Sequence, residues 1–310
     1  MDVLTHGLAG ALVARAVVGP GSWPVVAAAV AGALAPDVDV VARLWDPMAP
    51  ITVHRTATHS FAGGLPLAGG VAGIVKLRAR HLSFPALAGF AYLGVLSHIG
   101  LDLLTPFGTA ALWPLSPRRF GLGWLYVLDP VVLGLVVGGL LLAWNWTGHR
   151  VAAPRWALWM LAAYALVAGM LGGFAVARWE GVLAARGIPS TRVAVVPSFP
   201  GPWRWVGVAE TDVTLYRASF WLAGGSTPQL ASFSKEPLDG LTDLEALPEV
   251  QAFRAFARVP WFTATADGDA QVVEFRDLAF QDHPFGGPMA LRLRLDRSGA
   301  VTDIELGHKL

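Results

Sequence analysis

Ionisable side chains are sparse in the first half of this 310-residue chain, and most of them fall in short motifs. The segment HRTATHS, residues 54–60, sets two imidazoles and a guanidinium between two long apolar stretches. A charge at mid-bilayer costs at least ~2.5–3.5 kcal/mol on insertion scales, so such groups usually face a protein interior and serve a function. The other candidates are Asp2 with His6, Asp37 with Asp39, His98 with Asp102, Arg118 with Arg119, and Asp129.

Two pairs of these residues have spacings that suit metal binding. His98 and Asp102 are four residues apart, which places them on one face of a helix. An imidazole and a carboxylate that project together can ligate one metal, or one can orient the other. Asp37 and Asp39 repel each other at their spacing, so a cation beside them would stabilise both charges.

The HRTATHS segment offers two further imidazoles. His54 and His59 are five residues apart, a poor spacing for one helical face. We therefore expect His54 in a loop and His59 at the start of a helix, with Thr58 or Ser60 as the cap.

The chain contains no cysteine, so any bound metal must be held by His, Asp or Glu. These ligands favour a hydrolytic site for a divalent ion such as Zn²⁺ or Mn²⁺. Such an ion lowers the pKa of bound water toward about 7. We expect Arg55 to bind a phosphate oxygen in a forked contact, and Asp39 or Asp129 to act as general base.

Taken singly, each of these residues also has a structural explanation. Helix ends, interfaces and buried ion pairs all employ the same side chains. The structural alternatives are a packed interfacial histidine at His6, a solvated helix end at Asp37 and Asp39, a buried pair or proton relay at His98 and Asp102, headgroup contacts of Arg118 and Arg119, and a helix cap at Asp129.

The composition divides the chain into a membrane part, 1–178, and a soluble part, 179–310. Of all residues 54% are hydrophobic and 15% are charged, whereas soluble domains have about a quarter charged residues. The deficit lies in the first part, where segments of about 20 apolar residues predict membrane spans. The six candidates are 3–19, 22–38, 59–76, 84–104, 127–146 and 156–178.

Six spans would place the N-terminus, all the motifs above and the soluble part on the same side of the membrane. This convergence predicts a single site. The opposite loops and their flanks are basic, so they are expected in the cytoplasm and the site outside it; their basic residues are Lys76, Arg78, Arg80, Arg150 and Arg155. The first segment lacks a basic leader region, so we expect it to be retained as a span.

Residues 179–310 alternate as strands and predict a small α+β domain with a mostly antiparallel sheet. The expected helix is 243–259, with Pro248 breaking or starting it. The net charge of +1 gives no reason to expect nucleic acid as a partner. The expected strands are 204–210, 213–222, 271–280, 289–296 and 301–307, with a hairpin turn at 296–300.

The motifs MDVLTHGLAG, APDVD, HRTATHS and SHIGLDLLTPFG together resemble the YdjM-like family of bacterial inner-membrane proteins, described as membrane-bound metal-dependent hydrolases. They occur in the family's order and cover about residues 1–135. The family is distantly similar to zinc-dependent phospholipase C and zinc nucleases, whose later HxxxE motif is missing here, which favours one or two ions over three. The resemblance implies metal ligands at His6, Asp37, Asp39, His54, His59, His98 and Asp102.

The sequence thus predicts a membrane-embedded metal-dependent hydrolase of the inner membrane, acting on a lipid, at a phosphoester. A transporter or proton relay would use the same His and Asp residues, but it would need ionisable groups through the depth of the bilayer. The third hypothesis is a non-catalytic membrane-anchored protein whose soluble domain binds a partner.

Overall fold

The computed structural model describes residues 1–310 except 20–21, 146–149, 225–226, 236–241, 281–288 and 309–310. It divides into two compact units. The helical unit comprises Met1–Ala42 and Val53–Met170, and the sheet unit comprises Arg43–Thr52 and Leu171–Leu310. The expected boundary after residue 178 lies inside one long helix that contributes to both units.

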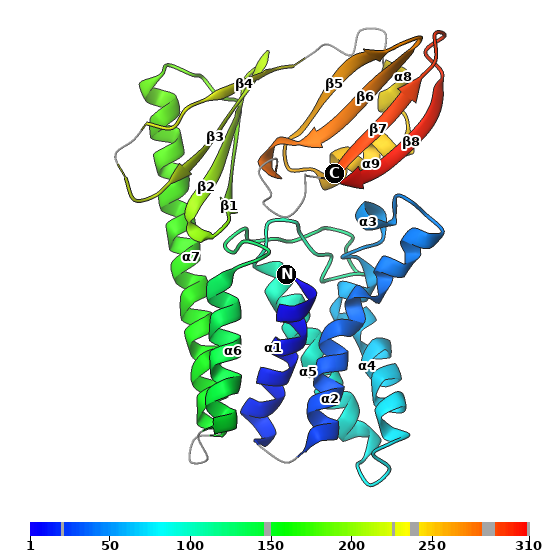
Figure 1. Cartoon of the computed structure of the whole chain (residues 1–310), viewed down its shortest axis with the longest axis vertical. Helices are drawn as coiled ribbons and strands as arrows, with labels where there is room; N and C mark the ends of the chain where they lie inside the picture. Colours follow the sequence, from blue (N-terminus) through cyan, green and yellow to red (C-terminus); the bar gives the residue numbers. More distant parts are fainter. Residues whose placement is uncertain (20–21, 146–149, 225–226, 236–241, 281–288, 309–310) are drawn as a thin grey trace. The chain divides into compact units, whose positions relative to one another are not determined.

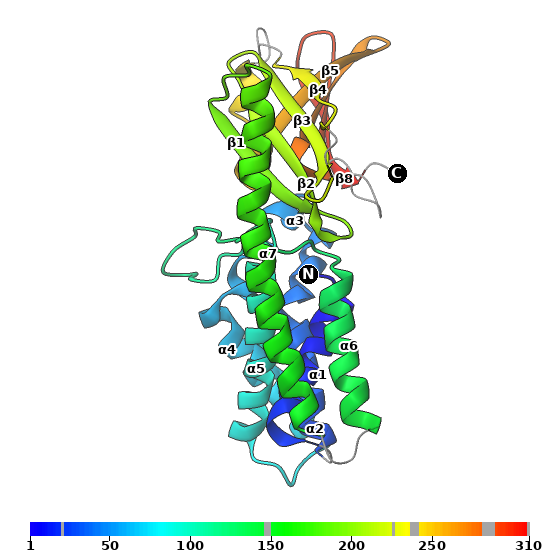
Figure 2. The same ribbon diagram turned by 90° about the vertical axis from the view of Figure 1, so that its left-hand side faces the viewer.

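Apolar helices lie side by side in the helical unit (Figures 1 and 2). Their faces are apolar all round, as expected of helices that meet lipid as well as each other. They are α1 (Val3–Val18), α2 (Trp23–Leu34), α4 (Phe61–Lys76), α5 (Phe84–Leu103), α6 (Pro130–Asn145) and the first part of α7 (Ala152–Ala185).

Three helical segments in the described residues are long and apolar enough to cross a membrane. They are Trp23–Leu44, Phe84–Leu103 and Ala152–Ala185. The helices α1, α4 and α6 have 16 residues each, or about 24 Å at 1.5 Å per residue, against a hydrocarbon core of ~30 Å. All six expected segments are therefore helical, but among the residues that the structure describes only three helical segments reach the length of a full span.

Glycines let the backbones of α2 and α5 touch. A Cβ on Gly32 would lie 2.0 Å from the carbonyl oxygen of Ala91, and a Cβ on Gly94 would lie 2.0 Å from that of Ala29. Small residues at such crossings are typical of membrane helices, where close packing replaces the hydrophobic effect. The crossing holds the C-terminal end of α2 against the half of α5 that carries His98.

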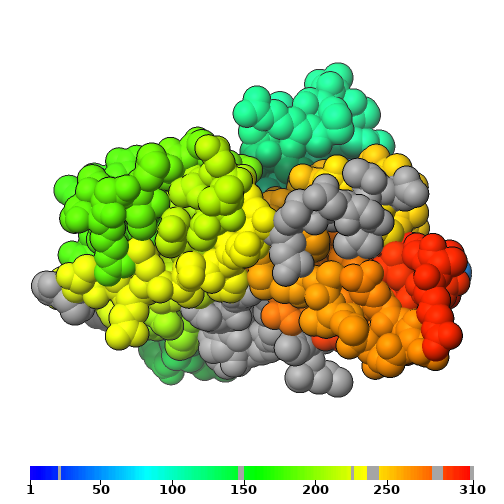
Figure 3. Space-filling model, turned by 90° about the horizontal axis from the view of Figure 1, so that it is seen from above, coloured from blue at the N-terminus to red at the C-terminus, as the bar shows by residue number. Residues whose placement is uncertain are grey.

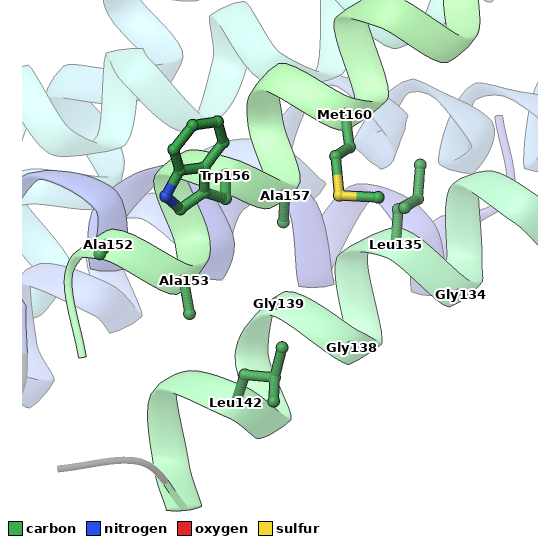
Figure 4. Close-up of a pocket in the computed structure, with 10 residues that line it drawn as sticks. All are labelled: Gly134, Leu135, Gly138, Gly139, Leu142, Ala152, Ala153, Trp156, Ala157 and Met160. Atoms are coloured by element: carbon green, nitrogen blue, oxygen red, sulfur yellow. The ribbon is translucent and has the colours of Figure 1, made fainter. Parts of the chain in front are cut away.

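The contact between α6 and α7 is partly open and forms an apolar groove of about 330 Å³ (Figure 4). A Cβ on Gly139 would lie 2.5 Å from the Cβ of Ala157, so the helices touch there. Cβ atoms on Gly134 and Gly138 would meet nothing within 4 Å. Trp156 and Met160 line the groove from α7.

Two antiparallel four-stranded sheets lie side by side in the sheet unit (Figure 1). In the space-filling view their residues form two neighbouring groups, one green to yellow and one orange to red (Figure 3). The five expected strands are present, and β1, β4 and β5 were not expected. The first sheet is β1 (Arg192–Ser198), β2 (Gly201–Glu210), β3 (Thr214–Trp221) and β4 (Ala231–Ser234), and the second is β5 (Pro260–Asp267), β6 (Ala270–Asp277), β7 (Met289–Leu295) and β8 (Val301–His308).

Each sheet packs against helices. The fully buried Trp179 on the last part of α7 contacts the first sheet, where a Cβ on Gly207 would lie 2.4 Å from its ring. The second sheet packs against α8 (Thr242–Glu245) and α9 (Pro248–Phe256). The expected helix 243–259 is thus two helices, because Pro248 starts the second one.

A short helix from the N-terminal part of the chain belongs to the sheet unit. Helix α3 (Ala49–Thr52) packs beside α9, and its Ile51, only 3% exposed, shares a core with Val250, Phe253 and Leu291. This helix was not expected, because residues 43–52 lie between the expected spans 22–38 and 59–76 and contain no periodic pattern that was assigned to an element.

We predict that Ile51→Ala destabilises the sheet unit, although the residue lies between membrane segments in sequence. Truncating a fully packed isoleucine leaves a cavity that costs about 2–5 kcal/mol. Thermal unfolding of the purified protein, followed by near-UV circular dichroism, measures the loss. Val53→Ala, at a residue 37% exposed, is the control and should have little effect; equal effects would contradict the assignment of α3 to this core.

A valine at Gly94 should force α2 and α5 apart, because its Cβ would overlap the Ala29 carbonyl. Overpacking typically costs about 1–3 kcal/mol, and a backbone clash exceeds a side-chain one. The unfolding temperature in detergent should fall for Gly94→Val and stay close to wild type for Gly89→Val on the same helix, where a Cβ meets nothing within 4 Å. Unchanged stability of Gly94→Val would rule out the close crossing.

Candidate metal centre

The candidate residues lie at one end of the helical unit, on elements whose ends the sequence defines. Asp2 caps α1 by accepting hydrogen bonds from the backbone N–H and hydroxyl of Thr5, at 2.9 and 2.6 Å. This sets His6 in the first turns of α1, where it is 1% exposed. At the end of α5, His98 and Asp102 share one face, as their spacing predicted, and both are buried.

A 3₁₀ helix carries the two aspartates that follow α2. The α-helix ends at Leu34, because Pro36 has no N–H for the next intrahelical hydrogen bond. The chain continues as the 3₁₀ helix η1 (Ala35–Leu44), which contains Asp37 and Asp39. The side chain of Asp39 is 2% exposed and that of Asp37 is 21% exposed. Asp39 is therefore enclosed by the site, and Asp37 reaches its edge.

The HRTATHS segment folds back sharply before α4. The 3₁₀ turn η2 (Ala57–His59) precedes Ser60, whose hydroxyl caps α4 by accepting the N–H of Gly63 at 2.9 Å. Gly63 is required, because a Cβ there would lie 1.9 Å from the carbonyl oxygen of Ala57. Thr58 is not the cap, but donates a hydrogen bond to Asp39 Oδ2 at 2.6 Å. His59 thus points into the site from the turn before the helix.

Three overlapping groups of His and Asp side chains could each hold a metal ion, with ligand atoms within 4.8 Å of one another. His98 belongs to two of the groups and His59 to two, so the groups form a continuous cluster. The structure therefore brings together all seven residues that were expected as metal ligands. The groups are His6, His98 and Asp102; Asp37, His59 and His98; and Asp39, His54 and His59.

The tautomer of a neutral His98 is fixed by a backbone contact. Its Nδ1 lies 2.7 Å from the carbonyl oxygen of Ala33, which can only accept, so Nδ1 carries the proton. Nε2 then presents a lone pair, and it lies 3.6 Å from both Asp37 Oδ1 and Asp102 Oδ2. In this tautomer of the neutral ring, three acceptor atoms converge with no hydrogen between them. A cation relieves this repulsion, and a backbone bond of this kind is typical of metal-binding histidines.

His6 is also unsatisfied within the described part of the chain. Both ring nitrogens are buried without a hydrogen-bond partner there, and Nε2 lies 3.4 Å from Asp102 Oδ1. The ring stacks on that of His98, with centroids 3.6 Å apart. A buried polar group without a partner costs about 1–3 kcal/mol, a cost that a metal bond would remove.

His59 connects the two aspartates of η1. Its Nε2 lies 3.3 Å from Asp37 Oδ1 and its Nδ1 lies 3.2 Å from Asp39 Oδ2. Burial lowers the pKa of His59, but the hydrogen bonds to Asp37 and Asp39 outweigh it and raise the pKa above its ordinary value. A proton on His59 therefore compensates these carboxylates when no metal does. His54 Nδ1 adds a contact of 2.8 Å to Asp39 Oδ1.

Arg55 lies beside the cluster and is engaged within the protein. It adopts a φ of +62°, in the left-handed region, and is 7% exposed. Its Nη2 donates to Asp102 Oδ1 and its Nη1 to Thr105 Oγ1, each at 2.9 Å. The amino group of Met1 contacts the same Asp102 oxygen. Arg55 therefore orients Asp102, and three of its five N–H donors are not used in these bonds.

Asp129 lies outside the three groups and caps α6. Its carboxylate accepts the N–H groups of Val131 and Val132, at 2.9 and 3.1 Å, and the hydroxyl of Tyr164 at 2.8 Å. Burial raises its pKa, opposed by the Tyr164 and backbone hydrogen bonds. These contacts are those of a structural cap, and a catalytic role for Asp129 stays a prediction.

The two adjacent arginines play different parts. Arg119 Nη2 donates to the carbonyl oxygen of His54 at 3.1 Å, and burial lowers its pKa, helped by the nearby Arg55. Arg118 is exposed and lies over the ring of Phe120.

The sequence analysis did not predict the hydrogen bonds that Thr58, Thr105 and the Ala33 carbonyl form with the site residues. Thr105 lies just after the end of α5, and its closeness to Asp102 in sequence was the only signal for it.

Residues 1–178 match the family described as YdjM inner membrane protein. The chain is also 34% identical over 140 residues to the uncharacterized protein YfhP of Bacillus subtilis (strain 168), a match that covers 43% of each chain. The chain therefore spans less than half the length of this curated relative. No solved structure matches the chain. Because the family match covers more than half of the sequence and contains all the clustered residues, this chain is a member of the YdjM inner membrane protein family.

Proposed function

We propose that the helical unit holds one or two divalent metal ions, Zn²⁺ or Mn²⁺, and hydrolyses a phosphoester of a membrane lipid. The observation that carries the metal is the convergence of the His98 Nε2 lone pair with two carboxylates. The donor set of imidazole and carboxylate, without sulfur, suits these ions. Metal-assisted hydrolysis is the chemistry that such sites commonly perform.

The location of the cluster supports a lipid substrate. All its residues lie at the ends of the helices, where a phospholipid headgroup would also be found. A transport pathway would need ionisable groups along the depth of the bundle, and the cluster in the described residues is confined to one end. The loops at the opposite end are basic, which favours a cytoplasmic position for them and an extracytoplasmic one for the site.

The residues of the cluster would have distinct roles in binding the metal and the substrate. His6, His98 and Asp102 form one outer ligand group, and Asp39, His54 and His59 form the other, with Asp37 close to both His98 and His59. A bound ion would polarise the phosphoryl group and a water molecule. Asp39 would accept the proton of the attacking water, and the free donors of Arg55 would bind a phosphate oxygen.

Metal affinity should fall as the pH is lowered from about 8 to 6, since ligand imidazoles must be deprotonated. The raised pKa of His59 means that its proton persists to a higher pH than usual, so the ion must displace it and protons are released on binding. Titration calorimetry with Zn²⁺ in two buffers of different ionisation enthalpy measures both the affinity and the number of protons.

His98→Ala should weaken Zn²⁺ binding by more than the roughly 10–100-fold caused by losing an outer-shell partner. The matched control is His81→Ala, at an exposed histidine of the opposite loop, which should bind as wild type. Binding that is independent of pH, or that His98→Ala and His81→Ala affect equally, would refute the metal centre.

Purified protein should release a phosphorylated headgroup from phospholipid in mixed micelles, and a chelator should abolish the reaction. Asp39→Asn should lower kcat by roughly 10²–10⁴-fold, the range for loss of a general base, while the ion held by His6, His98 and Asp102, a group that does not include Asp39, is retained. Asp46→Asn, at an exposed aspartate of the sheet unit, is the control. Products are measured by ³¹P NMR. Full metal binding with no phosphoester cleaved would leave the metal centre standing and overturn the hydrolase.

A further inference from the structure

We propose that the loop between α5 and α6, residues 112–118, is a lipid-contacting element. It would insert its apolar side chains at the boundary between headgroups and hydrocarbon, and present Arg118 to lipid phosphates. The proposal depends on the exposure, charge and anchoring of this loop, and it is independent of any hydrolytic activity. Figure 2 shows the loop projecting sideways from the helical unit, in blue-green.

The loop exposes large apolar side chains in a short stretch. Leu115 is 91% exposed, Leu112 is 44% exposed and Trp113 is 40% exposed. Backbone bonds hold them in place, because the N–H of Trp113 donates to Ala110 O at 3.0 Å and that of Leu115 to Leu112 O at 2.9 Å. The apolar side chains are therefore presented outward by a defined turn.

The base of the loop is fixed to the folded core. Thr109 and Phe120 form an antiparallel bridge with two hydrogen bonds, at 2.8 and 2.9 Å, and Thr109 is fully buried. Ala110 and Ala111 are also buried. Exposure thus begins abruptly at Leu112, which is the pattern of a tip that protrudes from a rigid support.

The charge of the loop favours an anionic lipid surface as the partner that covers it. No Asp or Glu occurs between Asp102 and Asp129, whereas Arg118 and Arg119 are adjacent. Arg118 is exposed and forms no ion pair with a carboxylate in the described residues. Guanidinium groups bind phosphate in forked contacts, and tryptophan favours the bilayer interface.

The position of the loop along the chain indicates where its tip lies relative to the bilayer. The loop follows α5, a segment long and apolar enough to cross the membrane, and precedes the apolar α6. The exposed tip begins at Leu112, in the connection that follows the end of the span at Leu103, and so it lies on the side of the membrane where that span reaches the interface. A lipid surface would therefore cover the apolar side chains of the tip without a protein partner.

The same loop is joined to the HRTATHS segment. The N–H of Ala110 donates to the carbonyl oxygen of Arg55 at 2.9 Å, and Arg119 Nη2 donates to that of His54 at 3.1 Å. Lipid contact at the tip would therefore hold the segment that carries His54 and His59 at a set distance from the bilayer surface.

The test uses single cysteines in this cysteine-free chain. Leu115→Cys, Ser298→Cys and Met160→Cys carry a nitroxide label in full-length protein, in vesicles of phosphatidylcholine and phosphatidylglycerol. Ser298 lies in an exposed turn of the sheet unit and is the water control, and Met160 is exposed on the apolar α7 and is the lipid control. Electron paramagnetic resonance compares collisions with oxygen, which concentrates in lipid, and with a water-soluble nickel complex.

The label at Leu115 should be reached mainly by oxygen, as at Met160, and that at Ser298 mainly by the nickel complex. Adding Arg118→Gln to Leu115→Cys should shift its label toward the nickel complex, and omitting phosphatidylglycerol should shift it likewise. A water-like signal at Leu115 in every vesicle would overturn the proposal. So would dipolar broadening between Leu115 labels, which would assign the surface to a second copy of the chain. All variants should keep the unfolding temperature of the wild type, because the substituted residues are exposed.

Discussion

The helical unit is arranged around an excess of buried acceptors at one end. Imidazole lone pairs and carboxylates converge there from α1, η1, the HRTATHS segment and α5, and they need positive charge to coexist. The protein supplies part of it through Arg55 and the amino group of Met1, both on Asp102. Neither group forms a hydrogen bond with His98 Nε2 or with the ring nitrogens of His6, which have no such partner in the described residues. That imbalance is the physical reason to place a cation among them.

The cluster depends on helix packing that has nothing to do with charge. The crossing of α2 and α5 at Gly32 and Gly94 brings the Ala33 carbonyl within 2.7 Å of His98 Nδ1. That bond in turn aims Nε2 at the aspartates. The glycine at position 63 has the same effect for the HRTATHS turn, by letting it fold against its own backbone. Small residues thus set the geometry, and the polar residues provide the groups that could hold a metal ion.

Much of this site could be predicted from the sequence, because few charged groups occur in the apolar segments. The order of the predicted spans then determines which of these groups lie at the same end of the helical unit. The His98 and Asp102 pair needed only the helical period. The Ala33 carbonyl and the Thr58 hydroxyl could not be predicted, since both act through contacts distant in sequence. The length of each helix could not be predicted from hydropathy either. Hydropathy identifies all six apolar segments, but capping residues such as Asp2 and Ser60 determine where α1 and α4 begin.

The α3 segment makes the sheet unit discontinuous in sequence. The chain leaves the helical unit at Arg43, near the end of η1, contributes Ile51 to the sheet core and returns at Val53. Asp39 and His54, on the two sides of this excursion, are hydrogen-bonded to each other. The covalent chain therefore passes between the two units three times, and no single cut separates them. A shortened protein ending near residue 178 would retain the matched family region but leave Ile51 with its apolar surface in water. Genetic dissection of this protein has to remove α3 together with the C-terminal strands, or keep both.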